Sequence, residues 1–436
     1  MNKDLKVSVI GGGSSYTPEL IEGFIESRDE LPVKQIALMD IDPRRLEIIG
    51  GLAGRMLRAS QAQIDLQLTT NREAAIAGSD FVISQIRVGG MAARILDEKI
   101  PLQYGLIGQE TTGPGGFAKA LRTIPVALAI AADIDRLASG AILINFTNPA
   151  GLITEALQRY SPVNAIGLCN LPIGAEMRIS KHLGVERRRI ALDWAGLNHL
   201  NWIRGATLDG QDIWPQVFEQ ALEEARQNPD DGWSFSAELL EQLGMIPCGY
   251  LNYYYNRETV LQKLKQTPLT RGEEVQEIEA QLLEMYQDPE LREKPALLEK
   301  RGGAYYSKAA VSLIAAIAND KNEVHIVNTV NGGALPGLER QDVVEVPSRI
   351  GAQGASPLPA APMPPEIRGL VQAVKAYEQL AAKAGAEGDR QAALQALLAH
   401  PLVPSFQVAR DLLPALLQAH RAHLPQFFPE DRPGPA

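Results

Sequence analysis

The sequence predicts an α/β protein whose first part is a doubly wound parallel sheet. Two observations carry this prediction. Short apolar runs typical of buried strands alternate with longer amphipathic stretches typical of helices. The first apolar run ends in three consecutive glycines, and the second ends in an acidic residue. Strands that alternate with helices favour right-handed crossovers and parallel pairing.

The elements of this first part follow in a regular order. The first strand is expected at 6–10, before the glycines, and the first helix at 19–27. Later strands are expected at 35–40, 66–69, 81–86, 141–148 and 165–168, with helices at 43–57 and 117–137. The open parallel sheet that results would bind ligands outside the carboxyl ends of its strands.

After about residue 192 the pattern changes to longer helices and fewer strands. Strands are expected at 324–331 and 342–346, and the Pro/Ala-rich segment 352–365 reads as a loop or linker. Apolar residues from Ile367 to Leu380 recur at helical spacing. The predicted division is residues 1–195 for the parallel-sheet domain and 196–436 for a mostly helical α+β domain that carries substrate binding, catalysis and oligomer contacts.

Composition excludes several classes of partner. The 436 residues are 45% hydrophobic and carry a net charge of −10, which disfavours nucleic acid and anionic membranes but leaves room for a small anionic substrate. The two cysteines provide no disulfide framework. No apolar run reaches the ~18 residues of a membrane span, and no signal peptide is visible. The cytoplasm is therefore the expected location.

The glycine turn and the acid after the second strand predict a dinucleotide site. Gly11 and Gly13 let the backbone approach a pyrophosphate, and Ser14 and Ser15 follow at the helix start. Asp40 is placed to bind ribose hydroxyls. This combination is typical of a Rossmann-like domain, and the alternative is a glycine-rich turn that binds nothing.

Two features modify this interpretation. Tyr16 stands where the usual motif has its third glycine. Asp40 favours NAD over NADP because a carboxylate repels a 2′-phosphate, although Arg44 and Arg45 lie close in sequence.

Cys169 and Asn170 follow the short strand at 165–168. A thiol at the carboxyl end of a strand can bind a metal, attack a substrate or pack in the core. For an isolated cysteine, packing is the more common role. The residues alone leave these alternatives open.

Six motifs are similar to those of a known family. They are Gly11–Leu20 (GGGSSYTPEL), Gly108–Gly116 (GQETTGPGG), Asn145–Pro149 (NFTNP), Gly167–Asn170 (GLCN), Gly196–His199 (GLNH) and Asp342–Pro347 (DVVEVP). With them the chain resembles the family 4 glycoside hydrolases, most closely their 6-phospho-β-glucosidase branch. The motifs occur in family order up to about residue 350, and the remainder is similar only in its helical character.

The resemblance implies an unusual hydrolysis that requires NAD and a divalent metal, usually Mn²⁺, in place of two carboxylates. NAD⁺ takes a hydride from C3 of the sugar, and the ketone acidifies the C2 proton. A base removes that proton, the C1 oxygen leaves by elimination, water adds back and NADH returns the hydride. The implied substrate is a 6-phosphorylated disaccharide or aryl glycoside, and the enzyme is expected to be a homo-oligomer, a dimer or tetramer.

The resemblance also implies roles for individual residues. Cys169 and His199 would be the metal ligands, although a Cys–His pair alone suits zinc better than Mn²⁺. Tyr250 would remove the C2 proton, with Tyr253 as the alternative, and Glu110 would raise the basicity of that phenol.

Further residues are implied at the sugar. Arg94 and Asn148 would contact the sugar phosphate or hydroxyls, and Arg271 matches a later basic contact. Arg87 is a further candidate without a family match. Asn170 would act at the leaving group, where members specific for α-glycosides carry aspartate, and the asparagine indicates a β-glycoside.

Two other functions are weighed against this one. A plain NAD-dependent dehydrogenase of a small hydroxy acid or sugar would share the nucleotide half, but it needs a His–Asp relay that the sequence does not display. A nucleotide-binding sensor without turnover would lack the glycine turn or the Cys169–His199 pair, and both are present.

Overall fold

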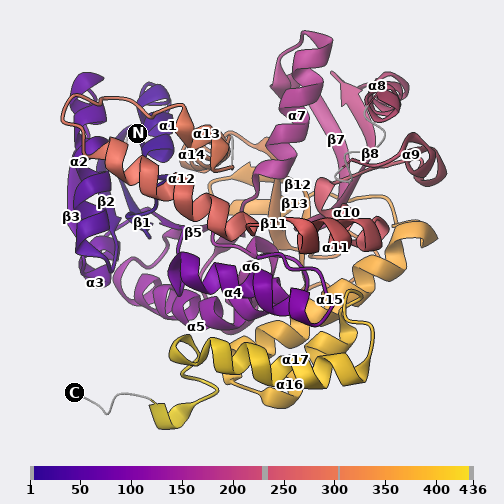
Figure 1. The fold of residues 1–436 in the computed structure, drawn as a ribbon. Helices are drawn as coiled ribbons and strands as arrows, with labels where there is room; N and C mark the ends of the chain where they lie inside the picture. Colours follow the sequence, from indigo (N-terminus) through magenta and orange to yellow (C-terminus); the bar gives the residue numbers. More distant parts are fainter. Residues whose placement is uncertain (1–3, 228–233, 303–304, 432–436) are drawn as a thin grey trace.

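A computed structural model describes residues 4–227, 234–302 and 305–431. Strands and helices alternate through its first half, as the sequence predicts (Figure 1). These elements are β1 (Leu5–Ile10), α1 (Thr17–Glu26), β2 (Val33–Met39), α2 (Pro43–Ala59), β3 (Asp65–Thr69), α3 (Arg72–Ile76), β4 (Phe81–Ser84), α4 (Gly90–Gln103), α5 (Gly113–Leu137), β5 (Ile142–Asn145), α6 (Ala150–Tyr160), β6 (Ala165–Gly167) and α7 (Asn170–Leu183).

The six strands form a parallel sheet in the order β3-β2-β1-β4-β5-β6. This is the doubly wound order of Rossmann folds, with the switch point between β1 and β4. Four of the six residues of β1 have no exposed side-chain surface or nearly none, and β4 is buried throughout, because helices cover both faces of the sheet. The predicted fold class is confirmed.

Three strands from the second half of the chain extend the same sheet. β11 (Glu323–Val330) lies antiparallel beside β6, with Asn328 opposite Gly167. β12 (Val343–Gly351) and β13 (Gly354–Pro357) continue from it as antiparallel neighbours. The sheet therefore continues beyond the first 195 residues, and the division at that point stays a prediction.

The prediction of a loop or linker at 352–365 is wrong in part. Residues Gly354–Pro357 pair with the end of β12, where Ile350 lies opposite Ala355. The proline and alanine content concealed a short edge strand, because its pairing depends on β12 rather than on its own periodicity. The rest of the segment has no regular structure until α15 (Pro365–Glu387) begins.

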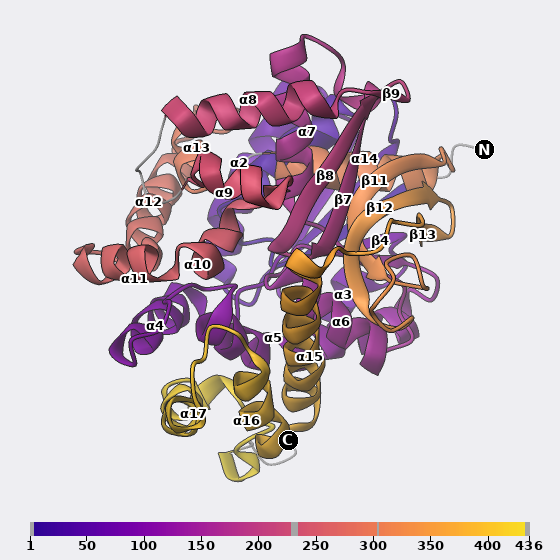
Figure 2. The same ribbon diagram turned by 90° about the vertical axis from the view of Figure 1, so that its right-hand side faces the viewer.

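A second, smaller sheet stands beside the first (Figure 2). Its main pair is the hairpin of β7 (Ile190–Leu197) and β8 (Leu200–Leu208), which are longer than most strands of the first part. Two short strands, β9 (Gln211–Asp212) and β10 (Ile246–Pro247), also pair with β8. The hairpin brings Asn198 and His199, the two residues between its strands, to one end of the small sheet.

Helices make up most of the second half. They are α8 (Trp214–Gln227), α9 (Ala237–Leu243), α10 (Asn252–Tyr255), α11 (Arg257–Gln266), α12 (Arg271–Tyr286), α13 (Leu297–Lys300), α14 (Tyr306–Ala318), α15, α16 (Arg390–Ala399) and α17 (Phe406–Ala419). α14 packs on α1 at one face of the large sheet, whereas α15 packs on α5 and α6 at the other. The second half thus completes the core of the first. None of the helices in the described part of the chain combines the length and apolar character that a bilayer span requires.

Candidate active site

The glycine turn follows β1 at the carboxyl edge of the large sheet. The amides of Gly11 and Gly12 both donate to the Met39 carbonyl, at 2.9 and 2.7 Å. Gly11 has a φ of 90°, and a Cβ there would lie 2.8 Å from the Gln85 carbonyl oxygen. Only glycine fits this backbone, which leaves the start of α1 open toward a ligand.

Asp40 is held at the end of β2 by this turn. Its Oδ2 accepts a hydrogen bond from the Gly13 amide at 2.8 Å, and its Oδ1 accepts one from the Asp42 amide at 3.0 Å. A Cβ on Gly13 would lie 2.6 Å from the same carboxylate. The side chain that is predicted to bind the ribose is therefore fixed by the backbone that is predicted to bind the pyrophosphate.

Ser14 and Ser15 differ in their surroundings. Ser14 lines the main cavity together with Gly11, Gly13 and Asp40. Ser15 is fully buried, and its hydroxyl donates to Glu279 Oε1 at 2.8 Å. The structure thus gives Ser15 a role in joining the turn before α1 to α12, while its predicted role at the cofactor stays a prediction.

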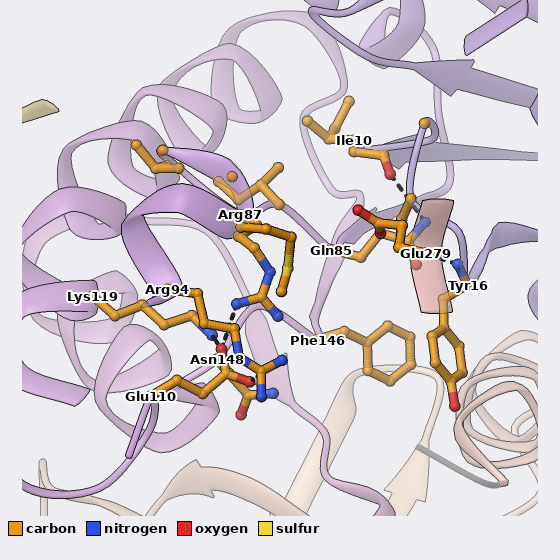
Figure 3. Close-up of a pocket in the computed structure, with 18 of the residues that line it drawn as sticks. Ile10, Tyr16, Gln85, Arg87, Arg94, Glu110, Lys119, Phe146, Asn148 and Glu279 are labelled. Carbon is orange, nitrogen blue, oxygen red and sulfur yellow. Dashed lines mark hydrogen bonds and ion pairs between the residues drawn. The ribbon is translucent and has the colours of Figure 1, made fainter. Parts of the chain in front are cut away.

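One cavity of about 970 Å³ connects the glycine turn with the small sheet. Its wall passes from Asp40 along the end of β4 to His199 and Tyr250. Figure 3 shows Arg87, Arg94 and Lys119 gathered near Glu110 on one side. The volume lies at the upper end of the range for small-molecule sites, so a cofactor and a second ligand can fit together.

Cys169 and His199 come from different sheets; His199 lines this cavity, and Cys169 is buried next to it. Cys169 directly precedes α7, and His199 lies in the β7–β8 turn. The Cys169 Sγ and His199 Nε2 atoms are 3.6 Å apart. This distance is shorter than the sum of ordinary metal–sulfur and metal–nitrogen bonds, about 2.3 and 2.1 Å for zinc, so both atoms can reach one ion.

The hydrogen bonds of His199 point its free nitrogen toward Cys169. The Thr111 hydroxyl donates to Gln109 Oε1 at 2.9 Å, so it accepts from His199 Nδ1 at 3.1 Å. This leaves the Nε2 lone pair facing the thiol. Burial, followed by the charge of Lys119, lowers the pKa of His199 to about 3, so its imidazole is neutral, as a metal ligand must be.

The donor set therefore fits a catalytic divalent ion. Burial raises the pKa of the Cys169 thiol, and a bound cation would favour the thiolate. Among the residues that the structure describes, no cluster of three or more His, Cys, Asp and Glu side chains forms a complete metal cage. A two-ligand site leaves positions for substrate oxygens and water, which is the arrangement that Lewis-acid catalysis needs.

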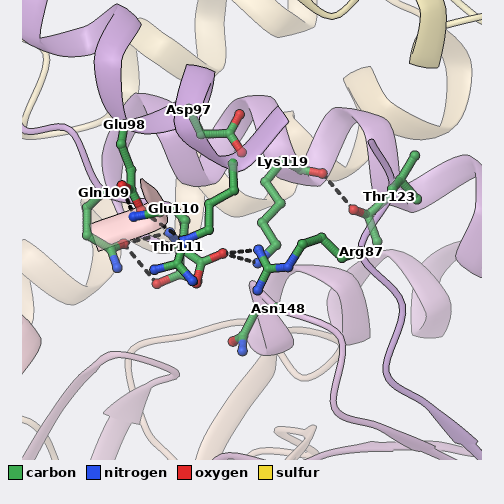
Figure 4. A network of polar contacts seen from close by, with 12 residues as sticks. Arg87, Asp97, Glu98, Gln109, Glu110, Thr111, Lys119, Thr123 and Asn148 are labelled. Carbon is green, nitrogen blue, oxygen red and sulfur yellow. Dashed lines mark hydrogen bonds and ion pairs between the residues drawn. The ribbon is translucent and has the colours of Figure 1, made fainter. Parts of the chain in front are cut away.

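Glu110 is the centre of a buried ion cluster (Figure 4). It pairs with Arg87, with Lys119 at 2.7 Å and with Arg94 at 3.1 Å. Burial alone would raise the pKa of Glu110, but the three cations hold it well below its usual range. Burial and the Arg87 charge lower the pKa of Lys119 to about 7. Arg94 also pairs with Glu98 at 2.9 Å, so three basic groups face two carboxylates. The excess of basic groups leaves the cluster attractive to an anion.

The two candidate bases lie in the same cavity. The Tyr250 ring stacks on the His199 ring at 3.8 Å between centroids and 4° between planes. The Tyr253 ring lies 6.0 Å from that of Tyr250. Burial, and then the neighbouring Tyr253, Cys169 and Glu110, raise the pKa of Tyr250 well above its usual value. The phenol of Tyr250 is the nearer of the two to the metal ligands.

The other predicted residues are placed as follows. Asn148 lines the cavity, and its amide donates to the Tyr306 hydroxyl at 3.5 Å. Asn170 also lines it, at the first turn of α7. Arg271 lies at its edge with a half-exposed side chain that pairs with Glu274 at 2.9 Å and donates to the Lys300 carbonyl.

Several residues of the site escaped the sequence reasoning. Lys119 lines the cavity from an apolar helix, and Thr111 lies behind the cavity wall next to Glu110, where it contacts His199. Arg301 directly follows α13, and Tyr306 is the first residue of α14; both line the cavity. Only Thr111 carried a usable signal, because it belongs to the glycine-rich loop 108–116.

A Gly13→Ala substitution tests the turn. The new Cβ would push against Asp40 and break the Gly13–Asp40 hydrogen bond, so NAD affinity should fall about tenfold or more. Isothermal titration with NAD⁺ measures this. Gly51→Ala is the matched control, because its Cβ would meet only Arg55 at 3.5 Å inside α2. Unchanged NAD affinity in Gly13→Ala would contradict the assigned nucleotide site.

The sheet order, the glycine turn with Asp40 and the adjoining Cys–His pair define a dinucleotide-dependent enzyme of the Rossmann class with a place for a catalytic metal. Comparison with known proteins specifies it further. Residues 6–185 match the model of the family 4 glycosyl hydrolases, and residues 194–403 match that of their C-terminal domain. The chain belongs to the family 4 glycosyl hydrolases.

Three similar proteins are named for 6-phospho-β-glucosidase activity, whereas a 6-phospho-α-glucosidase of Leptotrichia buccalis is 31% identical over 97% of this chain and 99% of its own length. A probable 6-phospho-β-glucosidase of Bacillus subtilis is 48% identical over 98% of this chain and 99% of its own length. A 6-phospho-β-glucosidase of Escherichia coli is 40% identical, covering 98% of both chains. The structure of the Thermotoga maritima 6-phospho-β-glucosidase with manganese, NAD⁺ and glucose-6-phosphate is 34% identical, with a TM-score of 0.89 over 96% of this chain and 99% of that one.

Proposed function

We propose that this protein hydrolyses 6-phospho-β-glucosides, such as phosphorylated cellobiose, with NAD and a divalent metal, Mn²⁺ first among them. One observation carries the proposal. A single cavity is lined by the glycine turn with Asp40, by His199 and by the cationic cluster around Glu110, and the buried Cys169 thiol lies 3.6 Å from His199 Nε2. The relatives at 48% and 40% identity are named for this activity, and the ligands of the Thermotoga maritima structure support the cofactors.

Each part of the cavity has its task. The glycine turn and Asp40 bind and orient the nucleotide, and Cys169 and His199 hold the ion. When bound, NAD⁺ supplies a hydride acceptor and the divalent ion supplies a Lewis acid. The phenolate oxygen of Tyr250 is the proposed acceptor of the C2 proton, with that of Tyr253 as the alternative, so the phenol proton has to leave before this step.

The cationic cluster accounts for a 6-phosphorylated substrate. Arg87 and Arg94 share the carboxylate of Glu110, and their planar groups can bind phosphate oxygens in pairs. Asn148 lies in the same cavity wall for a sugar hydroxyl, and Arg271 lies at the entrance. We propose that the phosphate binds on this side of the cavity.

The proposed β preference rests on Asn170. An asparagine amide can donate a hydrogen bond but cannot release a proton at neutral pH, so it cannot serve as the acid for a leaving oxygen. In the α-specific members of the family an aspartate occupies this position. We therefore propose that the leaving group departs from the β side.

The test compares 6-phosphocellobiose with 6-phosphomaltose, with and without NAD⁺ and Mn²⁺. We expect cleavage of the cellobiose derivative to be faster by at least tenfold, to require both cofactors and to proceed without net NADH accumulation. Faster cleavage of the maltose derivative would refute the β assignment. Efficient cleavage of unphosphorylated cellobiose would refute the phosphate requirement. Stoichiometric NADH release would favour the dehydrogenase alternative.

Location and assembly remain proposals from the sequence. The two cysteines are free in the structure, in keeping with a reducing compartment such as the cytoplasm. A homo-oligomer, dimer or tetramer, is proposed from the family resemblance, and light scattering of the purified protein would measure its mass.

A further inference from the structure

The side chain of Glu345 lies outside the site described above, yet it is fully buried at the centre of a hydrogen-bond cage. Glu345 belongs to β12 and to the motif at 342–347 that the proposed reaction does not use. Its Oε1 accepts from the amides of Asn198 (2.9 Å) and Asn328 (3.1 Å), and its Oε2 accepts from the Asn201 amide (2.7 Å) and the Trp194 indole (3.1 Å).

The four donors of this cage are neutral and come from four segments. Trp194 lies on β7, Asn198 in the turn, Asn201 on β8 and Asn328 on β11. Each carboxylate oxygen accepts two N–H groups, which a protonated acid could not match, because its O–H would face a donor. The four N–H donors favour the charged form of Glu345, but burial without a salt bridge opposes it and raises the pKa of the carboxyl to about 7. A cation bound nearby would favour the carboxylate.

The turn that carries His199 depends on this cage. His199 has a φ of 62°, a left-handed conformation that costs about 1–2 kcal/mol for a residue with a Cβ. Such a conformation persists only where the surroundings impose it. Asn198 and Asn201 lie on either side of His199, and both donate to Glu345. The carboxylate thus holds the turn from both sides.

The same cage reaches the other metal ligand. The Asn328 amide also donates to the Gly167 carbonyl at 3.4 Å, two residues before Cys169. The Asn198 side chain also acts on the Cys169 thiol, whose pKa it lowers against the larger effect of burial. Glu345 therefore contacts the His199 turn directly and reaches the Cys169 segment through Asn328, although the two segments come from different sheets.

Glu345 can also supply negative charge near a divalent ion whose two side-chain ligands do not neutralise it. A divalent ion bound by one thiolate and one neutral imidazole retains a positive charge, and the carboxylate of Glu110 is already shared by Arg87, Arg94 and Lys119. Outer-shell carboxylates commonly orient metal ligands and strengthen metal binding.

We propose that Glu345 is a positioning residue of the metal site, which fixes the His199 turn and the Cys169 segment for a divalent cation and favours the cation by its charge. This role rests on the proposed function. It extends that function to a residue that touches neither the metal nor the sugar.

Glu345→Gln tests the role because it preserves shape while it removes the charge and replaces one acceptor with a donor. Mn²⁺ affinity is measured on the chelator-treated full chain by the electron paramagnetic resonance signal of free Mn²⁺. We expect the Kd for Mn²⁺ to rise about 10–100-fold, with NAD⁺ affinity within twofold of wild type. With Co²⁺ in place of Mn²⁺, the near-ultraviolet thiolate charge-transfer band should weaken or shift.

The matched control is Glu155→Gln. Glu155 is equally buried, accepts from Lys375 at 2.8 Å and anchors the same strand through the Val343 amide at 2.6 Å, but its partners lie away from the metal ligands. The Glu155→Gln variant should have a lower Tm than the wild-type protein and a Kd for Mn²⁺ within twofold of the wild-type value. If Glu345→Gln folds and binds Mn²⁺ as wild type does, the role is refuted.

Two further variants decide the case if Glu345→Gln does not fold. Asn198→Ala removes one donor of the cage, and Glu345→Asp keeps the charge but shortens its reach. Each should weaken Mn²⁺ binding about tenfold, and wild-type affinity in both would refute the role. A wild-type protein that binds no divalent ion would instead refute the proposed function, and the role of Glu345 with it.

Discussion

His199→Ala is expected to abolish metal binding and to reduce cleavage of 6-phospho-β-glucosides at least 10³-fold. The imidazole Nε2 lies 3.6 Å from the Cys169 thiol, and its removal leaves a single side-chain ligand for the ion. Lewis-acid stabilisation is worth several kcal/mol in such reactions, which corresponds to a loss of this size. Metal content by atomic absorption, initial rates and NAD⁺ affinity measure the three parts of the prediction.

NAD⁺ affinity should stay unchanged, because the glycine turn and Asp40 do not contact the imidazole. Thr111→Val is a milder variant that keeps both metal ligands. It removes the hydrogen bond that orients His199, together with the one to Gln109, and should weaken metal binding about tenfold. Cys169→Ser should be as inactive as His199→Ala. The control is Cys248→Ser, at the second free cysteine, which is not assigned to the metal and should stay active. A His199→Ala protein that retains Mn²⁺ and cleaves at the wild-type rate would contradict the assignment of His199 as a metal ligand.

Tyr250→Phe is expected to lower cleavage by about 10²–10⁴-fold, the range over which a positioned proton acceptor contributes. The phenylalanine ring can keep the stacking on His199, so metal content and NAD⁺ affinity should be retained. Product that the wild-type enzyme forms in D₂O should carry deuterium at C2, because a phenol can exchange its proton with solvent between steps.

Tyr253→Phe is the control for this prediction, since its ring lines the same cavity 6.0 Å from that of Tyr250. It should remain within tenfold of the wild-type rate. An active Tyr250→Phe together with an inactive Tyr253→Phe would transfer the role to Tyr253. Wild-type product without deuterium at C2 would count against proton removal at that carbon.

The sequence by itself determined the parallel half of the fold. Apolar runs and glycines are local signals, and they located β1, β2, β4 and the turn after β1 to within a few residues. The switch point between β1 and β4 follows from that order, so the glycine turn and Asp40 were expected at one edge of the sheet. The family resemblance then supplied the metal and catalytic residues, which local patterns left ambiguous.

The tertiary structure alone decided how distant segments meet. Nothing local in 323–357 indicates pairing with β6, because register and partner depend on the whole core. The ion cluster of Glu110 joins three cations that a chain pattern cannot distinguish from solvated surface charges. The cage around Glu345 joins four segments across two sheets. Local periodicity shows which face of an element is buried, whereas charge pairing and strained turns arise from contacts between elements that the folded chain brings together.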